Sequence, residues 1–342
     1  MKKMFLFAAA AMVSLSSCVQ TEEVYTGKLQ ELGFKSAVTR SIVDTIKDLV
    51  YPIAVSGVLD NTDDGIDNYS PYLTNSDPLA KYDNALFVYD EGTENWCGSP
   101  ARYWPSSGDM YFLAFCPCPT NATLKTNYNA TTGKIDNLTV TQVDNNIVNQ
   151  HDILYSDLIK VTAPKTEPQA LHFHHALTQI KVAFKKTESE AKVVVNSVML
   201  EDVFFAGNLV ITPVEGGNST ASWTTAGEEF AKSRYFNKNL QVSGIEDGTL
   251  DEILSSTTAY SPTPLLIIPS TKQGKIRIVY TVSDNKPQTY ELDLSTNGEA
   301  WEMGKKYTYN FLINVNEIRF KCSIDEWVSG NGDDGDGDDF TI

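Results

Sequence analysis

Apolar side chains recur at every second position along most of this chain. In the segment YTYNFLINV, residues 307, 309, 311, 313 and 315 are all apolar or aromatic. A period of two places such residues on one face of a β-strand. Four further alternating positions follow at Ile318, Phe320, Cys322 and Ile324, in the opposite phase. The change of phase predicts a bulge or bend near 316–317, because a one-residue shift exchanges the two faces.

The same alternation predicts strands in both halves of the chain. Further candidates are LHFHHALTQIKVAF, YPIAVSGVL, NALFVYD, DMYFLAFC, VVVNSVML, PLLIIPS, KIRIVYTV and TYELDLS. Gly, Asn, Asp and Pro separate these runs, as turns require. Helical spacing is confined to short stretches near Val43–Val50 and Thr249–Leu254. Many short strands with polar turns predict an all-β protein built from β-sandwiches.

Two composition changes divide the chain. The segment IKVTAPKTEPQA carries two prolines ahead of a new pair of strands, so we expect a domain boundary at 166–169. The expected β-sandwiches therefore cover residues 41–168 and 169–328. The last residues, 329–342, are rich in Gly and Asp and predict a flexible acidic tail.

The N-terminus has the organisation of an export signal. Lys2 and Lys3 precede an apolar run over 4–13, which is shorter than the about 20 residues that span a bilayer. Leu15-Ser16-Ser17-Cys18 then resembles the bacterial lipobox. In that motif the cysteine thiol receives a diacylglycerol, the chain is cut before the cysteine, and the new amine is acylated. We therefore expect a lipoprotein signal peptide over 1–17 and a chain held to the membrane by lipid at Cys18. The alternative is an ordinary signal peptide with an incidental cysteine.

Charge and cysteine content exclude several classes of protein. The 342 residues carry a formal net charge of −17, which opposes binding to nucleic-acid phosphates or anionic lipid head groups. Apart from Cys18, the cysteines are Cys97, Cys116, Cys118 and Cys322, too few for a disulfide-built scaffold. In an oxidising compartment Cys97 could pair with Cys116 or Cys118.

Candidate chemical motifs are few. His172, His174 and His175 lie in HFHH, but on a strand they divide between two faces, so we expect one packed histidine and no metal site. The tail sequence DDGDGDD lacks the ligand positions of an EF-hand. Hydrolase and phosphate-binding motifs are absent, and we expect neither a cofactor nor an enzyme, although separated carboxylates of a hydrolase cannot be recognised from sequence. Trp96, Tyr103 and Trp104 leave open a second function, a surface module that binds glycans.

Several segments together resemble a known family. In order, they are the lipobox, AVTRS at 37–41, YWPSSGDMYFLAFCP, DILYSD at 152–157, LHFHHALTQIKVAF and DEW at 325–327. This order resembles the fimbrillin family, the Mfa-like lipoproteins that build type V pili on Bacteroidota. The resemblance implies two tandem transthyretin-like β-sandwich domains and assembly by strand exchange after proteolysis at an arginine. It also implies a fimbrium on the outer membrane, with other pilin subunits as partners and a host or bacterial surface ligand as a further partner.

The expected cut lies between Arg40 and Ser41. The segment 18–40 alternates through Val24, Leu29, Leu32, Phe34 and Val38 and would form a first strand. Its removal would leave an open sheet edge that a strand of another subunit could fill. The candidate donor side chains are Tyr307, Tyr309, Phe311, Ile313, Val315, Ile318, Phe320 and Ile324. The alternative is that Arg40 is an ordinary surface arginine. We thus expect a structural or adhesive pilus subunit, with a glycan-binding lipoprotein or a secreted hydrolase as alternatives.

Overall fold

The fold is built from β-strands. The computed structural model describes residues 29–36, 52–61, 69–74, 84–116, 123–144, 152–186, 192–204, 206–224, 231–242, 264–269, 274–283, 286–294, 300–313 and 317–327. Every element whose bounds lie within these ranges is a strand, and Leu294 is the one helical position among them, which confirms the all-β prediction. The two expected helical stretches, 43–50 and 249–254, lie outside the described residues.

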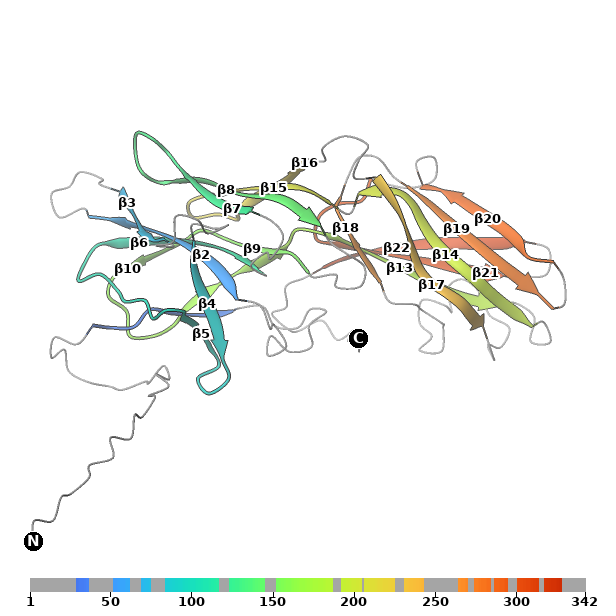
Figure 1. The fold of residues 1–342 in the computed structure, drawn as a ribbon, viewed down its shortest axis with the longest axis horizontal. Helices are drawn as coiled ribbons and strands as arrows, with labels where there is room; N and C mark the ends of the chain where they lie inside the picture. The colour runs from blue at the N-terminus through green and yellow to red at the C-terminus, as the bar shows by residue number, and fades with distance from the viewer. Residues whose placement is uncertain are drawn as a thin grey trace, which may run out of the picture.

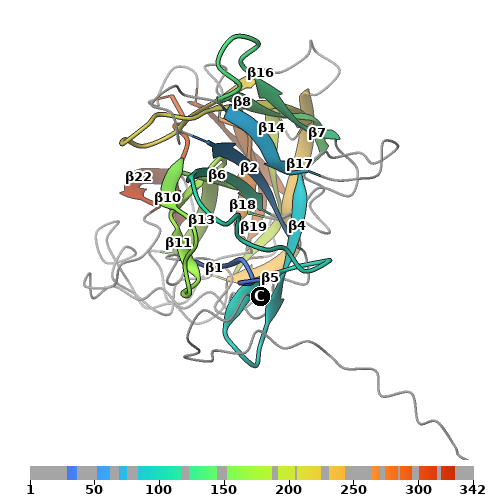
Figure 2. The ribbon, with the colours of Figure 1, turned by 90° about the vertical axis from the view of Figure 1, so that its left-hand side faces the viewer.

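The largest sheet, here called the N-terminal sheet, has ten strands in the order β11-β1-β5-β4-β2-β6-β9-β12, with β10 paired to β6 and β3 paired to β2. Its strands are β1 (Gly33–Ser36), β2 (Ile53–Asp60), β3 (Tyr69–Leu73), β4 (Ala85–Asp90), β5 (Asn95–Gly98), β6 (Asp109–Cys116), β9 (Leu154–Ser156), β10 (Ile159–Thr162), β11 (Gln169–Leu171) and β12 (Phe173–His175). Figure 2 shows the strands curving around a common interior. That interior holds one hydrophobic core, which includes Phe34, Phe87, Trp96 and Phe112.

A four-stranded sheet, here called the bridging sheet, covers the other face of β2 and β6. Its order is β16-β15-β8-β7, with bounds β7 (Thr123–Tyr128), β8 (Ile135–Asp144), β15 (Ala206–Thr212) and β16 (Thr220–Thr224). The second core lies between it and the N-terminal sheet and contains Leu113, Val140 and Leu209.

The bridging sheet joins strands from both sides of the expected boundary at 166–169. β8 pairs with β15, and β11 and β12 belong to the N-terminal sheet although both follow residue 168. The arrangement therefore differs from two sandwiches that each hold a separate core. A boundary at 166–169, between residues 41–168 and 169–328, would therefore separate strands that pair with each other.

The remaining strands form the C-terminal sandwich, which lies at the right of Figure 1. One sheet has the order β18-β13-β21-β22 and the other β17-β14-β19-β20. Their bounds are β13 (Thr178–Lys186), β14 (Val193–Phe204), β17 (Ala231–Val242), β18 (Leu265–Ile267), β19 (Lys275–Val282), β20 (Gln288–Asp293), β21 (Lys305–Ile313) and β22 (Ile318–Glu326). The third core fills the space between these two sheets and includes Phe184, Val198 and Ile278.

The phase change expected at 316–317 is a reversal of chain direction. β21 and β22 pair antiparallel, with Phe311 opposite Phe320 and Ile313 opposite Ile318. Both alternating sets therefore point into the same core. The sequence pattern located the break correctly, and the break separates two strands of a hairpin.

Candidate functional site

The segment before Arg40 supplies an interior strand of the N-terminal sheet. β1 lies between β11 and β5, with Phe34 opposite Gln169 on one side and Trp96 on the other. The ring of Phe34 is fully buried and makes edge contacts with Phe87 and Phe112, at centroid distances of 4.9 and 5.1 Å. A strand paired on both sides and filled with core side chains is integral to its sheet.

The residues just before β1 are held in the same way. The Leu32 amide donates to the Arg102 carbonyl at 2.7 Å, and the Trp104 amide donates to the Gln30 carbonyl at 2.9 Å. Leu32 is buried, whereas Leu29 is 72% exposed. Of the alternating positions expected in this segment, Leu32 and Phe34 are thus buried and Leu29 is exposed to solvent. Cys18, Val24, Val38, Arg40 and Ser41 lie outside the described residues.

The expected donor positions fall on two unequal strands. β21 pairs with β13 and β22, and its residues Tyr307, Tyr309, Phe311 and Ile313 are buried in the core of the C-terminal sandwich. β22 is an edge strand; Ile318 is buried at its start and Ile324 is 43% exposed near its end. Val315 lies outside the described residues. Phe320, on β22, is half-buried against the core.

The motifs DILYSD and HFHH meet as two adjacent strands. β9 and β12 pair antiparallel, with His174 opposite Tyr155 and His175 opposite Leu154. The aspartates that flank β9 each contact a histidine of β12. His175 Nδ1 lies 2.7 Å from Asp152 Oδ2, and both side chains are buried. The expectation of one packed histidine in HFHH is therefore confirmed.

Trp327, from the late motif DEW, completes the buried Asp–His pair. Its indole stacks on the His175 ring at a centroid distance of 3.9 Å and an interplanar angle of 13°. The Trp327 amide also donates to the Gly304 carbonyl, and the Gly304 amide donates to the Leu177 carbonyl. The end of β22 is thereby attached to the N-terminal sheet.

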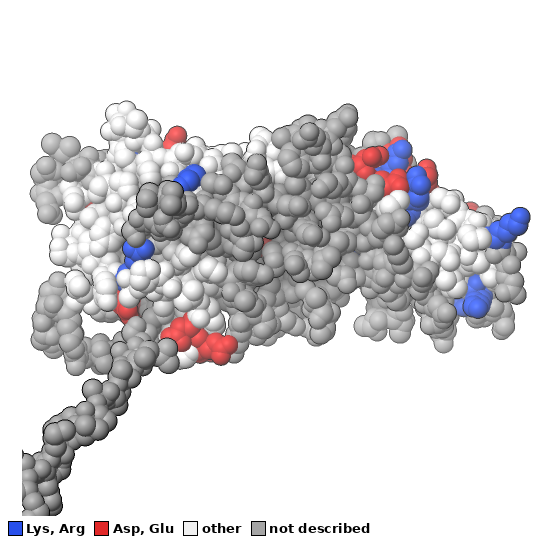
Figure 3. Space-filling view, in the orientation of Figure 1, with Lys and Arg blue, Asp and Glu red and all other residues white. Residues whose placement is uncertain are grey.

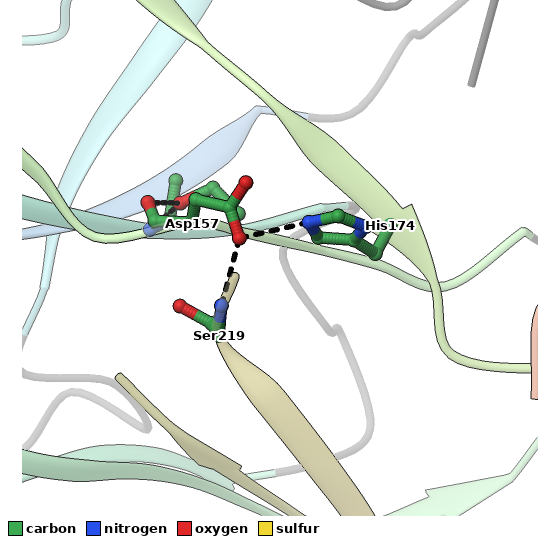
Figure 4. Close-up of polar contacts among 5 residues, drawn as sticks. Asp157, His174 and Ser219 are labelled. Atoms are coloured by element: carbon green, nitrogen blue, oxygen red, sulfur yellow. Dashed lines mark hydrogen bonds and ion pairs between the residues drawn. The ribbon is translucent and has the colours of Figure 1, made fainter. Parts of the chain in front are cut away.

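The second pair, Asp157 with His174, faces the bridging sheet (Figure 4). Asp157 Oδ1 accepts a hydrogen bond from the Ser219 amide and lies 2.8 Å from His174 Nε2. Ser219 immediately precedes β16, so this carboxylate connects the paired strands β9 and β12 to another sheet. Trp223 adds a further connection, since its Nε1–H donates to the Ala176 carbonyl at 2.6 Å.

The Asp157, His174 and Ser219 grouping does not have the geometry of nucleophilic catalysis. A catalytic serine requires its hydroxyl within hydrogen-bond reach of the base. Here the serine contacts the carboxylate through its backbone amide, and its buried hydroxyl has no hydrogen-bond partner among the described residues. Within the described ranges, no three His, Cys, Asp or Glu side chains gather in a way that could hold a metal ion. The contacts of Asp157 with His174 and Ser219 connect the N-terminal sheet to the bridging sheet.

The aromatic residues considered for glycan binding do not form an exposed platform. Trp96 and Trp104 are 2% and 4% exposed and belong to the core of the N-terminal sheet, whereas Tyr103 is 40% exposed. A sugar-binding surface needs exposed ring faces. The interpretation of these three residues as a glycan site is therefore wrong for the two tryptophans.

The structure also shows whether three of the cysteines form disulfide bonds. Cys97 is disulfide-bonded, while the sulfur atoms of Cys116 and Cys322 are not part of a disulfide bond. The alternative that pairs Cys97 with Cys116 is therefore excluded. Cys118 lies outside the described residues.

Two lysines lie against tyrosine rings near β3 and β6. Lys134 Nζ is 4.8 Å from the Tyr69 ring centroid, and Lys160 Nζ is 5.4 Å from that of Tyr111. Burial raises the pKa of Tyr69 to about 12. The Thr162 hydroxyl and the Lys160 ammonium lower the pKa of Asp109, whose carboxylate lies 2.9 Å from Lys160 Nζ. Each of these lysines already has an acidic partner, Glu215 for Lys134 and Asp109 for Lys160.

On the face shown in Figure 3, the charged side chains of described residues lie in small groups, several of mixed sign.

Sequence reasoning missed the two Asp–His pairs and the stacking of Trp327. The signal was present in the motifs DILYSD, HFHH and DEW. Their contacts depend on the pairing of β9 with β12 and on the path of β22, which spacing along the chain does not reveal.

Comparison with known proteins agrees with this architecture. A family model described as fimbrillin-like matches residues 39–327. The chain belongs to the fimbrillin-like family. The comparison with curated proteins finds no match.

Solved structures share the fold of this fimbrillin-like chain. A fimbrial protein from Bacteroides vulgatus matches with a TM-score of 0.55 and 16% identity, over 87% of this chain and 100% of that one. A putative cell adhesion protein from Bacteroides uniformis matches with a TM-score of 0.50 and 14% identity, over 87% and 99% of the two chains. No helix in the described part of the fimbrillin-like chain is long and apolar enough to cross a membrane.

Proposed function

We propose that this fimbrillin-like chain is a structural or adhesive subunit of a cell-surface pilus that assembles by strand exchange after proteolysis. Membership of the fimbrillin-like family supports the role of pilus subunit. In the proposal, the chain is exported by its signal peptide 1–17, lipidated at Cys18, and carried to the outer membrane. A cut between Arg40 and Ser41 then frees the segment 18–40.

The position of β1 is the observation that supports this proposal. β1 ends at Ser36, shortly before Arg40, and lies between β5 and β11. Its removal would leave two strands with unpaired backbone groups and a gap in the core where Phe34 and Leu32 are now buried. Unpaired sheet edges bind extended chains, so the gap would accept a strand from another subunit.

β22 is the part of the proposed donor region best placed for exchange. β21 could leave only if the sheet separated on both of its sides, because it pairs with β13 and β22. Among the described strands β22 pairs with β21 alone, and its side chains are less buried. We therefore narrow the donor to β22, with Ile318, Phe320 and Ile324 as the side chains that would enter the gap. A head-to-tail contact of this kind produces an open filament.

The uncut precursor would stay monomeric. Its own first strand competes for the gap at the high effective concentration of an attached segment. Polymerisation would begin only after the cut strand has left, and so would lag behind cleavage.

The test uses the purified precursor with an arginine-specific protease. The expected result is a cut at Arg40 followed by a ladder of polymers that resists mild denaturation, and Arg40→Ala should prevent both. Equal ladders from the Arg40→Ala protein would refute the mechanism. Complete cleavage at Arg40 without polymers would refute self-assembly.

A further inference from the structure

The two ends of the N-terminal sheet belong to one continuous stretch of chain. β11 and β12 stand at opposite ends of the strand order, yet only His172 separates them in the sequence. The first half of this stretch pairs with β1, where Gln169 lies opposite Phe34, and the second half pairs with β9. We call residues 169–175 the closing segment, because they join the two ends of the curved sheet (Figure 2) and so close it around its core.

β22 becomes more exposed toward its end, until Trp327 reverses the trend. Ile318 at the start of β22 is buried, whereas residues 324–326 are all exposed. Glu326 forms an ion pair with Lys305, but ion pairs at the surface contribute little to stability. Trp327, the next residue, is only 4% exposed. The position of the end of β22 is therefore set mainly by this tryptophan.

Trp327 is buried against the closing segment and not inside the sandwich to which β22 belongs. Its indole stacks on His175, the last residue of the closing segment, at a centroid distance of 3.9 Å. Trp327 is part of the core between the N-terminal and bridging sheets, whereas Ile318 and Phe320 of β22 contact the core of the C-terminal sandwich. β22 therefore cannot leave its sheet unless Trp327 also leaves a different core.

The stacked contact is stable and yet can be released. Trp327 Nε1 and His175 Nε2 are buried and have no hydrogen-bond partner among the described residues. A buried polar atom left unpaired is costly, and both nitrogens would gain water as a partner if the rings separated. Stacking and burial of the rings act in the opposite direction. A change in the position of His175 can therefore shift this balance toward release.

We propose that Trp327 is an autoinhibitory lock on β22, and that the closing segment opens this lock when β1 is lost. The proposal rests on the strand exchange proposed above, in which β1 leaves and β22 becomes the donor. In the uncut chain, β1 and β9 hold the two halves of the closing segment, and His175 is fixed against Trp327. Once β1 has left, β11 has no partner among the described strands. The closing segment then gains freedom, and its hold on Trp327 weakens.

The lock makes donation depend on the same event as acceptance. A subunit that keeps β1 has no gap for a foreign strand, and under this proposal its own β22 is also held. An uncut chain would therefore be unable to donate β22 to a cut one, and only subunits that have lost β1 would join a filament.

The lock is tested by hydrogen–deuterium exchange with mass spectrometry on the full uncut chain. In Trp327→Ala, the amides of β22 should exchange about 100-fold faster or more, the effect of removing a buried tryptophan on a local opening. Trp301→Ala is the matched control, because Trp301 is 3% exposed and lies in the core of the C-terminal sandwich; its β22 should exchange at the natural rate. Trp327→Leu, which keeps an apolar side chain without the stacked ring, should give a smaller rise and replaces Trp327→Ala if that variant does not fold.

Two outcomes would overturn the lock. One is an unchanged rate for β22 in both variants of Trp327. The other is an equal rise in Trp301→Ala, which would show that β22 opens only when the whole sandwich does.

The coupling to β1 is tested in the same chain, without a cut. In Phe34→Ala, the amides of the closing segment and of β22 should both exchange faster, with β22 rising about 2- to 30-fold, as expected for energetic coupling through packed elements. Added to Trp327→Ala, the same change should produce no further rise in β22, because no lock is left to open. Phe34→Leu, which retains more of the buried volume, takes the place of Phe34→Ala if that variant does not fold.

Rates in β22 that stay unchanged in the Phe34 variant would overturn the coupling, and so would an equal additional rise in the Trp327→Ala background. Neither test involves proteolysis or polymers. Failure of the lock would therefore be seen in the exchange rates alone, whereas failure of strand exchange would be seen as missing cleavage or missing polymers.

Discussion

Phe34→Ala tests how firmly β1 is held in the N-terminal sheet after the proposed cut. Phe34 is fully buried and lies against the rings of Phe87 and Phe112. Replacing a buried phenylalanine with alanine costs about 3–5 kcal/mol, because apolar contacts are lost and a cavity remains. At about 1.4 kcal/mol for each factor of ten, the cut strand should dissociate on the order of 100- to 4,000-fold faster.

The assay follows the strand itself. The precursor is labelled in the segment 18–40, cut at Arg40, and separated by size at successive times. Leu29→Ala is the matched control, since Leu29 belongs to the same segment and is 72% exposed; its strand should leave at the natural rate. If the Phe34→Ala strand remained bound as long as the natural one after complete cleavage, the inference that this side chain holds β1 in place would be wrong.

Three further changes test other parts of the account. Cys18→Ala should abolish labelling by palmitate and release the chain from membranes; labelling that persists would contradict lipidation at Cys18. Trp327→Ala should lower the free energy of unfolding in urea by about 3–5 kcal/mol, since a buried stacked ring is removed; Tyr103→Ala, at an exposed ring, should change it by less than about 0.5 kcal/mol. Burial raises the pKa of Tyr309, so the folded chain keeps its phenol neutral while the unfolded chain ionises above about pH 10. The stability of the natural chain should therefore fall as the pH rises past that value, and Tyr309→Phe should make the fall shallower; an identical pH profile for the two would refute this cause.

Part of the candidate site could be predicted because its signal is local. The burial of Leu32 and Phe34 follows from alternation within one short segment, as does the placement of one histidine of HFHH in the interior. The donor region shows the limit of this approach. Alternation identified both β21 and β22, but it could not show that β21 is an interior strand and β22 an edge strand. A strand is interior when a second strand pairs with its other side, and alternation along the chain does not show whether such a partner exists.

The sequence by itself determined which face of each strand is apolar and where the turns lie, since both depend on neighbouring residues. The export signal at the N-terminus stays a prediction from the sequence. The tertiary structure alone decided that β8 pairs with β15 and that β1 enters between β5 and β11. It also decided that Asp152, His175 and Trp327 meet. The physical reason is that backbone hydrogen bonds join strands without regard to side-chain identity, so the partner of a strand is selected by how all the apolar faces can be buried together.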